Sequence, residues 1–359
     1  MAGLLLVAFV FACSDSNIPA TSPNAILRVV SPTTTPAITP EPVIPPLTLD
    51  GIFPPRDLAP LKLDSSRLRT LIATGDVIPA RYSDRAIRLQ GDDFLYPVAY
   101  TADILRAADL TVINLEAPLL QSCPLPQEYS FTFCGRPGFI QALLAGGVDI
   151  ATLENNHITN YGPQGVAETV DLLEANGIAW ADRQQLAVRE VRGLRFGFLA
   201  FNGVGEAIDR TSMAGQIQSA RPQVDVLAVA FHWGAEYVSL PQPAPGIAPD
   251  DPAEIAHLAV DSGADLVIGN HPHWVQAVEL YQGKFIAYAH GNFIFDQMWS
   301  YETRVGVIGR YIFYDRTLVK VEFIPVLSHD YAQPRLLEGE ERQAVLDGMR
   351  EASQQLAGP

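Results

Sequence analysis

The sequence is poor in positive charge. It contains 24 Lys and Arg residues against 40 Asp and Glu residues, which gives a formal net charge of −16 at pH 7. Proteins that bind nucleic acid carry a basic patch or stripe for the phosphate backbone, and this composition does not supply one. We therefore exclude nucleic acid as a partner. An anionic substrate would need a local cation, such as a metal ion, to reverse the field of the acidic surface.

The N-terminus lacks a hydrophobic run of membrane-spanning length. Its apolar stretch, residues 3–12, is too short to cross a bilayer but has the length of a signal-peptide core. Val10-Phe-Ala-Cys13 resembles a bacterial lipobox, in which the cysteine is lipidated. We expect residues 1–12 to be a lipoprotein-like signal peptide, and Cys13 to anchor an exported protein at the extracytoplasmic face of the cell membrane. An ordinary signal peptide and an uncleaved apolar N-terminus are the alternatives.

Cysteine is scarce, with 3 residues in the whole chain. Cys123 and Cys134 lie in one loop-like segment, and no second Cys or His pair nearby in sequence suggests a metal site. In an exported protein, a local disulfide between them would stabilise the fold by about 3 kcal/mol through loop closure. We expect this disulfide, and two free buried thiols are the alternative.

The composition divides the chain into four parts. After the signal peptide, residues 13–66 are rich in Pro, Thr and Ser and bury too little surface to fold, which predicts a disordered tether. A folded domain is expected over residues 67–330, and a C-terminal helical extension over residues 331–359.

Strand-like and helix-like segments alternate along the predicted domain. Short apolar runs indicate buried strands, and the periodicity between them indicates helices. The expected strands are 68–74, 110–114, 149–152, 226–231, 266–268 and 284–288. The expected helices are 81–108, 139–145, 165–176, 253–262 and 340–356, and hairpins are expected at 188–201 and 311–327. This order predicts an α/β fold with two packed sheets and helices outside.

Polar side chains collect just after the predicted strands. In an extended chain, residues i and i+2 face the same side, so His271 and His273 can converge on one point. Ligands bind at the carboxyl ends of strands in α/β sheets. Mixed carboxylate, amide and imidazole donors suit Mn, Fe or Zn better than Ca or Mg, and we expect one or two such ions. The strand-end residues are Asp76, Glu116, Asn156, His157, His232, His271 and His273.

Ordinary structural roles compete with these assignments. Asp76 could cap a helix, Glu116 could be a surface charge, and Asn156 could be a turn residue. His232 could be a packed core histidine. Arg81 could neutralise an anionic substrate or pair with a carboxylate.

Six motifs together resemble the CapA family of poly-γ-glutamate capsule biosynthesis proteins, a branch of the calcineurin-like metallophosphoesterases. The resemblance covers about residues 67–328, and the ordered set is far more specific than any one motif. The motifs are Gly75-Asp76 with Arg81, Asn114-Leu-Glu116, Asn155-Asn-His157 with Gly162, His232-Trp-Gly-Ala-Glu236, Gly263-Ala-Asp265 leading to His271-Pro-His273, and Gly291-Asn-Phe293.

The resemblance implies a metallo-dependent phosphatase-like fold, a four-layer α/β/β/α sandwich with a dimetal centre at one edge of the sheets. It implies that Glu116 bridges the metals and that His157 is catalytic, as a general acid or as a group that stabilises the substrate. We also expect Arg81 to be catalytic, through contact with an anionic substrate. The implied ligands are Asp76, Glu116, Asn156, His232, His271 and His273. The residues expected beside the ligands or the substrate are Asn114, Glu236, His290 and Asn292.

The sequence also departs from the pattern of the family. Ile78 stands where a phosphoesterase has a metal-binding histidine, so we expect partial occupancy on the Asp76 side. Asn160, Asn270 and His290 stand where the branch commonly has Asp, His and Leu, respectively.

Two functions follow from the resemblance. The first is an exported protein of poly-γ-glutamate capsule or cell-envelope biosynthesis with a metal-dependent, hydrolase-type site for an anionic polymer or phosphoester. The second is a non-catalytic accessory or polymer-binding subunit that works with membrane polymer-synthase subunits. The sequence alone leaves open whether the chain is an enzyme.

Overall fold

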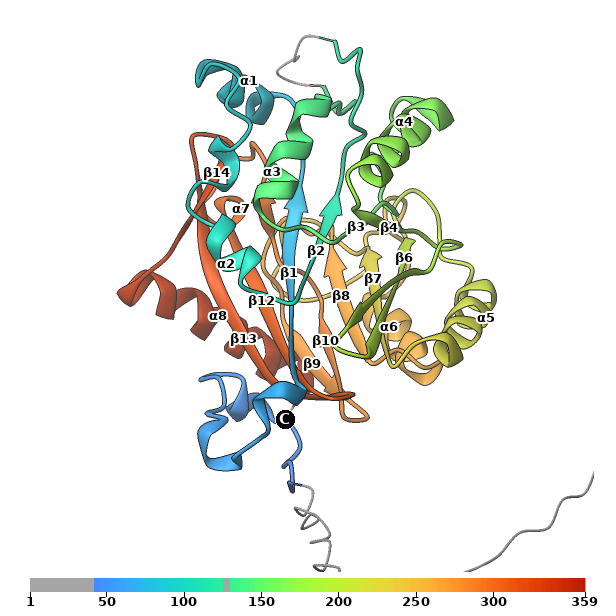
Figure 1. Ribbon diagram of the computed structural model, residues 1–359, viewed down its shortest axis with the longest axis vertical. Coiled ribbons are helices and arrows are strands. Elements are labelled where there is room, and N and C mark those ends of the chain that lie inside the picture. The colour runs from blue at the N-terminus through green and yellow to red at the C-terminus, as the bar shows by residue number, and fades with distance from the viewer. Residues whose placement is uncertain (1–41, 125–129, 359) are drawn as a thin grey trace, which may run out of the picture. The chain divides into compact units, whose positions relative to one another are not determined.

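Two β-sheets form the body of the protein in a computed structural model that describes residues 42–124 and 130–358 (Figure 1). The eight-stranded sheet has the order β14 (Gln333–Leu336), β13 (Thr317–His329), β12 (Val305–Tyr314), β1 (Leu68–Val77), β2 (Leu110–Leu115), β3 (Ile150–Thr152) and β4 (Ala179–Ala181), and β11 (Asn292–Ile294) also pairs with β1. The six-stranded sheet has the order β5 (Ala187–Val191), β6 (Leu194–Asn202), β7 (Val226–His232), β8 (Leu266–Asn270), β10 (Lys284–Ala287) and β9 (Val278–Tyr281).

Helices cover the outer face of each sheet. The apolar cluster beneath the eight-stranded sheet contains residues of α1 (Tyr82–Leu89), α2 (Ala102–Arg106), α3 (Ile140–Ala145) and α4 (Gly162–Ala175). The cluster on the outer face of the six-stranded sheet contains residues of α5 (Arg210–Ala220) and α6 (Pro252–Asp261). Figure 1 shows these two groups on different sides of the paired sheets.

The largest core lies between the sheets. Successive residues of a strand point to opposite faces, so Leu71 packs into the core between the sheets while Ile72 packs under the helices. Phe196 and Phe198 of β6 reach the same inter-sheet core from the other side. The predicted four-layer α/β/β/α arrangement is therefore confirmed.

The predicted strands and hairpins match the observed ones, but one predicted helix does not. Residues 81–108 form α1, a 3₁₀ turn at Tyr96–Val98 and α2 instead of one long helix. Gly91 adopts a φ of +72°, which ends the first helical segment, and Pro97 favours the start of a new turn. The short strands β4, β9, β11 and β14 are not predicted, because three or four residues are too few for a periodic pattern.

The N-terminal segment folds earlier than the composition predicts. Residues 1–41, which include the predicted signal peptide, Cys13 and the first part of the tether, lie outside the described residues. From Leu49 onward the chain forms three 3₁₀ turns, and Ile52 and Phe53 are 1% and 6% exposed in the inter-sheet core. The predicted tether boundary at residue 66 therefore needs correction, because two apolar side chains anchor this segment.

The predicted C-terminal extension belongs to the domain core. Besides β14, it contains α8 (Gly339–Ala357), whose Leu346 and Met349 pack into the inter-sheet cluster. Cys123 and Cys134 are joined by a disulfide, with a Cα–Cα distance of 5.7 Å. Within residues 42–124 and 130–358, no helix combines the length and the apolar character needed to cross a bilayer.

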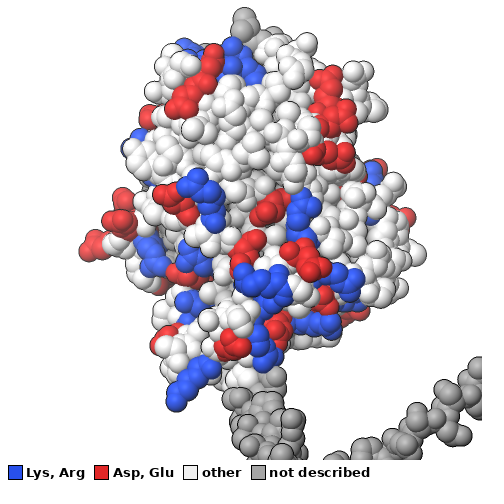
Figure 2. Space-filling view, viewed as in Figure 1, with Lys and Arg blue, Asp and Glu red and all other residues white. Residues whose placement is uncertain are grey.

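The charged side chains are not sorted into large patches on the face drawn in Figure 2. Basic and acidic residues lie next to one another over its lower half, and much of the upper centre is uncharged. Ion pairs of this kind occur elsewhere in the described residues too, such as Arg192 with Asp109. This face therefore offers no broad basic surface to a polyanion.

The burial of Ile52 gives a direct test of the corrected boundary. We expect Ile52→Ala to lower the free energy of unfolding by about 2–4 kcal/mol, because the substitution opens a cavity in a packed core. Val43→Ala is the matched control, because Val43 is 88% exposed. Urea denaturation of both variants measures the difference, and equal stabilities would show that this segment behaves as a tether.

Candidate metal centre

The carboxyl ends of strands from both sheets meet at one place. Asp76 lies near the end of β1 and Glu116 directly follows β2 in the eight-stranded sheet, while His232 ends β7 and His271 directly follows β8 in the six-stranded sheet. The backbone N–H of His271 donates to Asp76 Oδ2 at 3.3 Å, which joins the two sheets at this point. The parallel strands thus deliver the predicted polar groups to a shared edge.

Two glycines permit this close approach. A Cβ on Gly75, next to Asp76, would lie 2.0 Å from the carbonyl oxygen of Gly291. A Cβ on Gly269, two residues before His271, would lie 1.9 Å from the carbonyl oxygen of Tyr288. The residues that carry the site are therefore held against neighbouring backbone, which only glycine allows.

Asp76 is fully buried and fully hydrogen-bonded. Asn114 Nδ2 donates to Asp76 Oδ1 at 2.8 Å, and His273 Nδ1 lies 3.2 Å from Asp76 Oδ2. Burial pushes the pKa of Asp76 upward, but the hydrogen bond with His273 and the charges of His273 and His232 bring it below its ordinary value. Asp76 therefore stays ionised at neutral pH.

Glu116, unlike Asp76, is buried without hydrogen bonds from described residues to its carboxylate. Its side chain is 0% exposed, and among the described residues neither carboxylate oxygen has a hydrogen-bond partner. His232 Nε2 lies 3.3 Å and His157 Nε2 lies 3.9 Å from its Oε1. Burial and the nearby charge of Asp76 raise the pKa of Glu116 well above its ordinary value. A buried carboxylate of this kind needs a cation or a proton.

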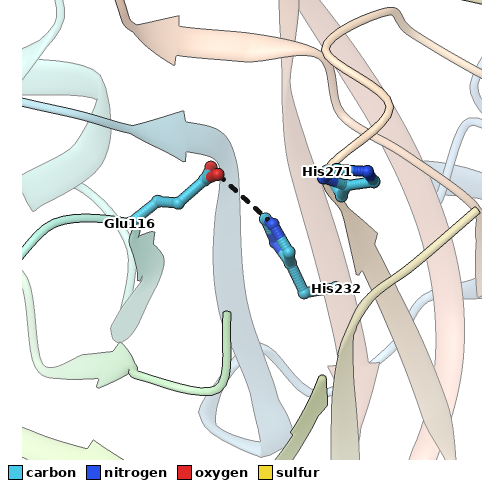
Figure 3. Close-up of side chains that lie close together, drawn as sticks. All are labelled: Glu116, His232 and His271. Carbon is cyan, nitrogen blue, oxygen red and sulfur yellow. Dashed lines mark ion pairs between the residues drawn. The ribbon is translucent and has the colours of Figure 1, made fainter. Parts of the chain in front are cut away.

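His271 offers unpaired nitrogens to the same region. It is 2% exposed, and both ring nitrogens lack a hydrogen-bond partner in the part of the chain that the structure describes. Its ring centroid is 4.8 Å from that of His232, and Figure 3 shows both rings beside the carboxylate of Glu116. Burial and the neighbouring histidines lower the pKa of His271 well below its ordinary value, so it is a neutral donor.

Three groups of side chains have donor atoms within 4.8 Å of one another, as a metal site requires. Each shares members with the other two, which suits adjacent ions. The groups are Glu116 with His232 and His271, Asp76 with Glu116 and His273, and Glu236 with His271 and His273. The unpaired oxygens of Glu116 and nitrogens of His271 fit a divalent ion better than they fit a structural role.

The Asn-His motif lies beside His232 Nε2, the nitrogen that also faces Glu116. Asn156 Oδ1 lies 2.8 Å from His232 Nε2, so this predicted ligand is within reach of the cluster. His157 is half-buried, stacks on Phe133 at 4.1 Å between ring centroids, and contacts Asn160 Oδ1 through Nδ1 at 3.1 Å. Burial lowers the pKa of His157 to about 4.

The residues predicted to lie beside the ligands divide into two groups. Asn114 and Asn292 contact Asp76 and His273 directly, and Glu236 Oε1 lies 3.9 Å from His273 Nε2. His290 instead points between the sheets, where it contacts Gly269 O at 3.3 Å and the Tyr311 hydroxyl at 2.7 Å. Its role in the structure is to join the sheets.

Arg81 is engaged within the protein. Its guanidinium pairs with Asp296 and lies over the rings of Phe133 and Phe295, at 4.8 and 5.1 Å from their centroids. The predicted catalytic contact between Arg81 and a substrate stays a prediction. In the structure, the guanidinium fixes an aromatic wall beside His157.

The sequence analysis assigns no role to three supporting residues. Asn155 donates to Asn114 Oδ1 and Leu115 O, and its own side-chain oxygen accepts from two backbone N–H groups of the following turn. Asp296 pairs with Arg81, and Gln297 links Asn292 to the hydroxyl of Tyr237. For Asn155, the turn preference of asparagine after a strand was an available signal.

Comparison with known proteins identifies the group to which this chain belongs. The family described as "Bacterial capsule synthesis protein PGA_cap" matches residues 70–297. The chain belongs to the PGA_cap family. This family is part of the metallophosphoesterase-like superfamily, and the resemblance inferred from the six motifs is confirmed.

Three relatives are each 26% identical to this chain over the aligned residues. "Capsule biosynthesis protein CapA" of Bacillus anthracis is 26% identical over 297 residues, 75% of this chain and 70% of that protein. "PGA biosynthesis protein CapA" of Bacillus subtilis (strain 168) is 26% identical over 279 residues, 71% and 70% of the two chains. "Probable polyglutamine synthesis accessory protein MT0602" of Mycobacterium tuberculosis is 26% identical over 221 residues, 53% and 56% of the two chains.

The buried position of His290 predicts an acid dependence of stability. Burial lowers its pKa from 6.5 to about 4. Between these values the unfolded chain binds a proton that the folded chain does not, so stability falls as the pH falls from 6.5 towards 4 and is unaffected at higher pH. From pH 7 to pH 5, we expect His290→Gln to lose about 1–2 kcal/mol less free energy of unfolding than the wild type.

Urea denaturation in the presence of EDTA measures this difference in pH slope. His329→Gln is the comparison variant: burial also lowers the pKa of His329, but its ring is only partly buried, so this variant should change the slope less than His290→Gln does. Identical slopes for His290→Gln and the wild type would show that His290 is not a source of acid sensitivity.

Proposed function

We propose that this chain binds one or two divalent transition metal ions, Mn, Fe or Zn, and uses them in a hydrolytic step of cell-envelope poly-γ-glutamate biosynthesis. The observation that carries the proposal is the buried pair of unpaired donors, Glu116 and His271. Membership in the PGA_cap family supports the link to capsule polymer. Export and a lipid anchor at Cys13 are part of the proposal and rest on the N-terminal sequence.

The residues present suit such ions. Carboxylate, amide and imidazole donors together favour Mn, Fe or Zn over the harder cations. When bound, a divalent ion supplies Lewis acidity towards a phosphoryl or carbonyl oxygen. The proposed ligands are Asp76, Glu116, Asn156, His232, His271 and His273.

His157 is best placed to accept a proton in the resting protein. The backbone N–H of Phe133 donates to Asn160 Oδ1 at 2.6 Å, so this oxygen is an acceptor and His157 Nδ1 carries the proton that it shares with Asn160. The lone pair of Nε2 then faces the cluster, 3.9 Å from Glu116 Oε1. With a pKa of about 4, the ring is neutral. It acts first as a base towards water and returns the proton to the leaving group afterwards.

A non-catalytic role is the second candidate. Two observations favour it: Ile78 offers no donor where the phosphoesterase pattern has a histidine, and Asp296 already neutralises Arg81, the cation nearest to the aromatic wall. In this alternative, the chain is an accessory or polymer-binding subunit that keeps the metal cluster as an anchor for anionic groups.

Metal analysis and a model reaction test the enzymatic proposal. We expect the purified wild type to contain at least one equivalent of Mn, Fe or Zn and to hydrolyse a model phosphodiester when Mn²⁺ is added. His157→Ala should lower kcat by about 10²–10⁴-fold, because it removes the proton acceptor, while the metal content stays unchanged.

His329→Ala is the control for loss of a histidine away from the site. Absence of a transition metal from the wild type, together with equal activity of His157→Ala, would overturn the proposal. Bound metal without turnover of any phosphoester or γ-glutamyl amide, in a protein that co-purifies with a membrane synthase, would favour the accessory role.

A further inference from the structure

We propose that Glu236 is itself a metal ligand and binds the same ion as His273. This inference rests on the proposed metal function and adds a donor that the motifs do not assign to the metal. The sequence placed Glu236 only beside the ligands or the substrate. The geometry points to direct coordination.

The position of the carboxylate is the first argument. Glu236, His271 and His273 form one of the three groups whose donor atoms lie within 4.8 Å of one another. Glu236 Oε1 lies 3.9 Å from His273 Nε2. His271, the third member, is buried with both ring nitrogens unpaired among the described residues. The group therefore contains a donor atom that lacks any other partner.

The orientation of the His273 ring is the second argument. Asn292 Nδ2 donates to Gln297 Oε1 at 3.2 Å and to Thr303 O at 2.9 Å, so the amide oxygen of Asn292 faces His273. His273 Nδ1 donates to this oxygen at 2.9 Å and also faces Asp76. The ring therefore presents Nε2, and not Nδ1, to a metal ion, and Nε2 is the atom that faces Glu236.

The backbone around Glu236 holds its carboxylate in place. The N–H of Ala235 donates to Gln242 O at 2.8 Å, and the N–H of Tyr237 donates to Pro272 O at 2.9 Å. The second bond ties Glu236 to the loop that carries His271 and His273. Tyr237 has a φ of +61°, an uncommon conformation for a bulky residue, which persists only where the surroundings impose it.

An ion bound beside His273 would gain from Glu236 a donor that strand β1 does not offer. After Asp76, strand β1 ends at Val77 and is followed by Ile78, and both side chains are apolar. Ile78 is 0% exposed and packs with Phe133 and Phe295, so that wall of the site is hydrocarbon. Glu236 approaches His273 from the loop after β7 and supplies the donor that β1 lacks.

An ordinary ion pair is the competing explanation. The Glu236 side chain is 39% exposed, and a surface carboxylate near a protonated histidine would also lie at this distance. The two explanations differ in what removal of the carboxylate does to metal affinity. A ligand sets the dissociation constant of one ion, whereas a surface ion partner leaves it nearly unchanged.

Measurement of Mn²⁺ binding to the full-length protein distinguishes metal ligation by Glu236 from an ordinary ion pair. We expect Glu236→Gln to raise at least one Mn²⁺ dissociation constant by tenfold or more, measured by isothermal titration calorimetry and by the EPR signal of free Mn²⁺. Glu236→Asp should recover part of the affinity, because it restores a carboxylate. Glu190→Gln is the matched control, since it removes one exposed negative charge from the edge strand β5.

The outcomes distinguish the inference from the proposed function. If Glu236→Gln and Glu190→Gln both keep every Mn²⁺ dissociation constant within twofold of the wild type, Glu236 is not a ligand, while the metal centre itself stands. If the wild type binds no Mn²⁺, Zn²⁺ or Fe²⁺, the proposed function fails together with the inference. Thermal unfolding without metal checks that each variant folds.

Discussion

The electrostatics of the strand-end cluster depend on one buried carboxylate. Glu116 has no solvent exposure and no hydrogen-bond donor among the described residues, and it lies near the ionised Asp76. The raised pKa of Glu116 reflects the electrostatic cost of a second negative charge at this point. A cation removes that cost, and the neutral imidazoles of His232 and His271 stand where they can share it. The strand ends thus gather donor atoms whose charge and spacing suit a cation.

The fold keeps this cluster in place by rigid contacts on every side. The core between the sheets fixes the strands, and the bond from the His271 backbone to Asp76 fixes the distance between the two sheets at the site. Asn114 and Asn292 orient Asp76 and His273, respectively. Because these supports come from strands and tight turns and not from long loops, the donor atoms have little freedom to rearrange.

Most of the fold and the central site residues could be predicted from the sequence, because both depend on short-range patterns. Apolar runs of four to seven residues predicted the long strands. The polar residues directly after these runs are the ones whose side chains lie together at the shared edge of the two sheets. The metal-ligand role that we propose for Glu236 was not predicted, since the argument for it depends on the ring orientation of His273, which Asn292 sets. Asp296 was missed because its partner Arg81 lies 215 positions away.

The order of residues 42–66 was missed for a related physical reason. Their composition is that of a tether, and their stability comes from a surface built by strands and by α8, much later in the chain. Local composition reports how much apolar surface a segment carries, but not whether a distant surface is shaped to receive it. Burial of two side chains, Ile52 and Phe53, attaches this segment to the inter-sheet core.

Strand β1 separates the point where the chain enters the domain from the candidate metal centre. The segment before β1 enters at the start of that strand, and Asp76 lies near its other end, about 25–30 Å away for a strand of this length. Figure 1 shows the N-terminal segment at the bottom and the end of β1 towards the top. A molecule that reaches the carboxylate and imidazole cluster therefore approaches the domain at the end remote from residues 42–67, and this N-terminal segment does not stand in its way.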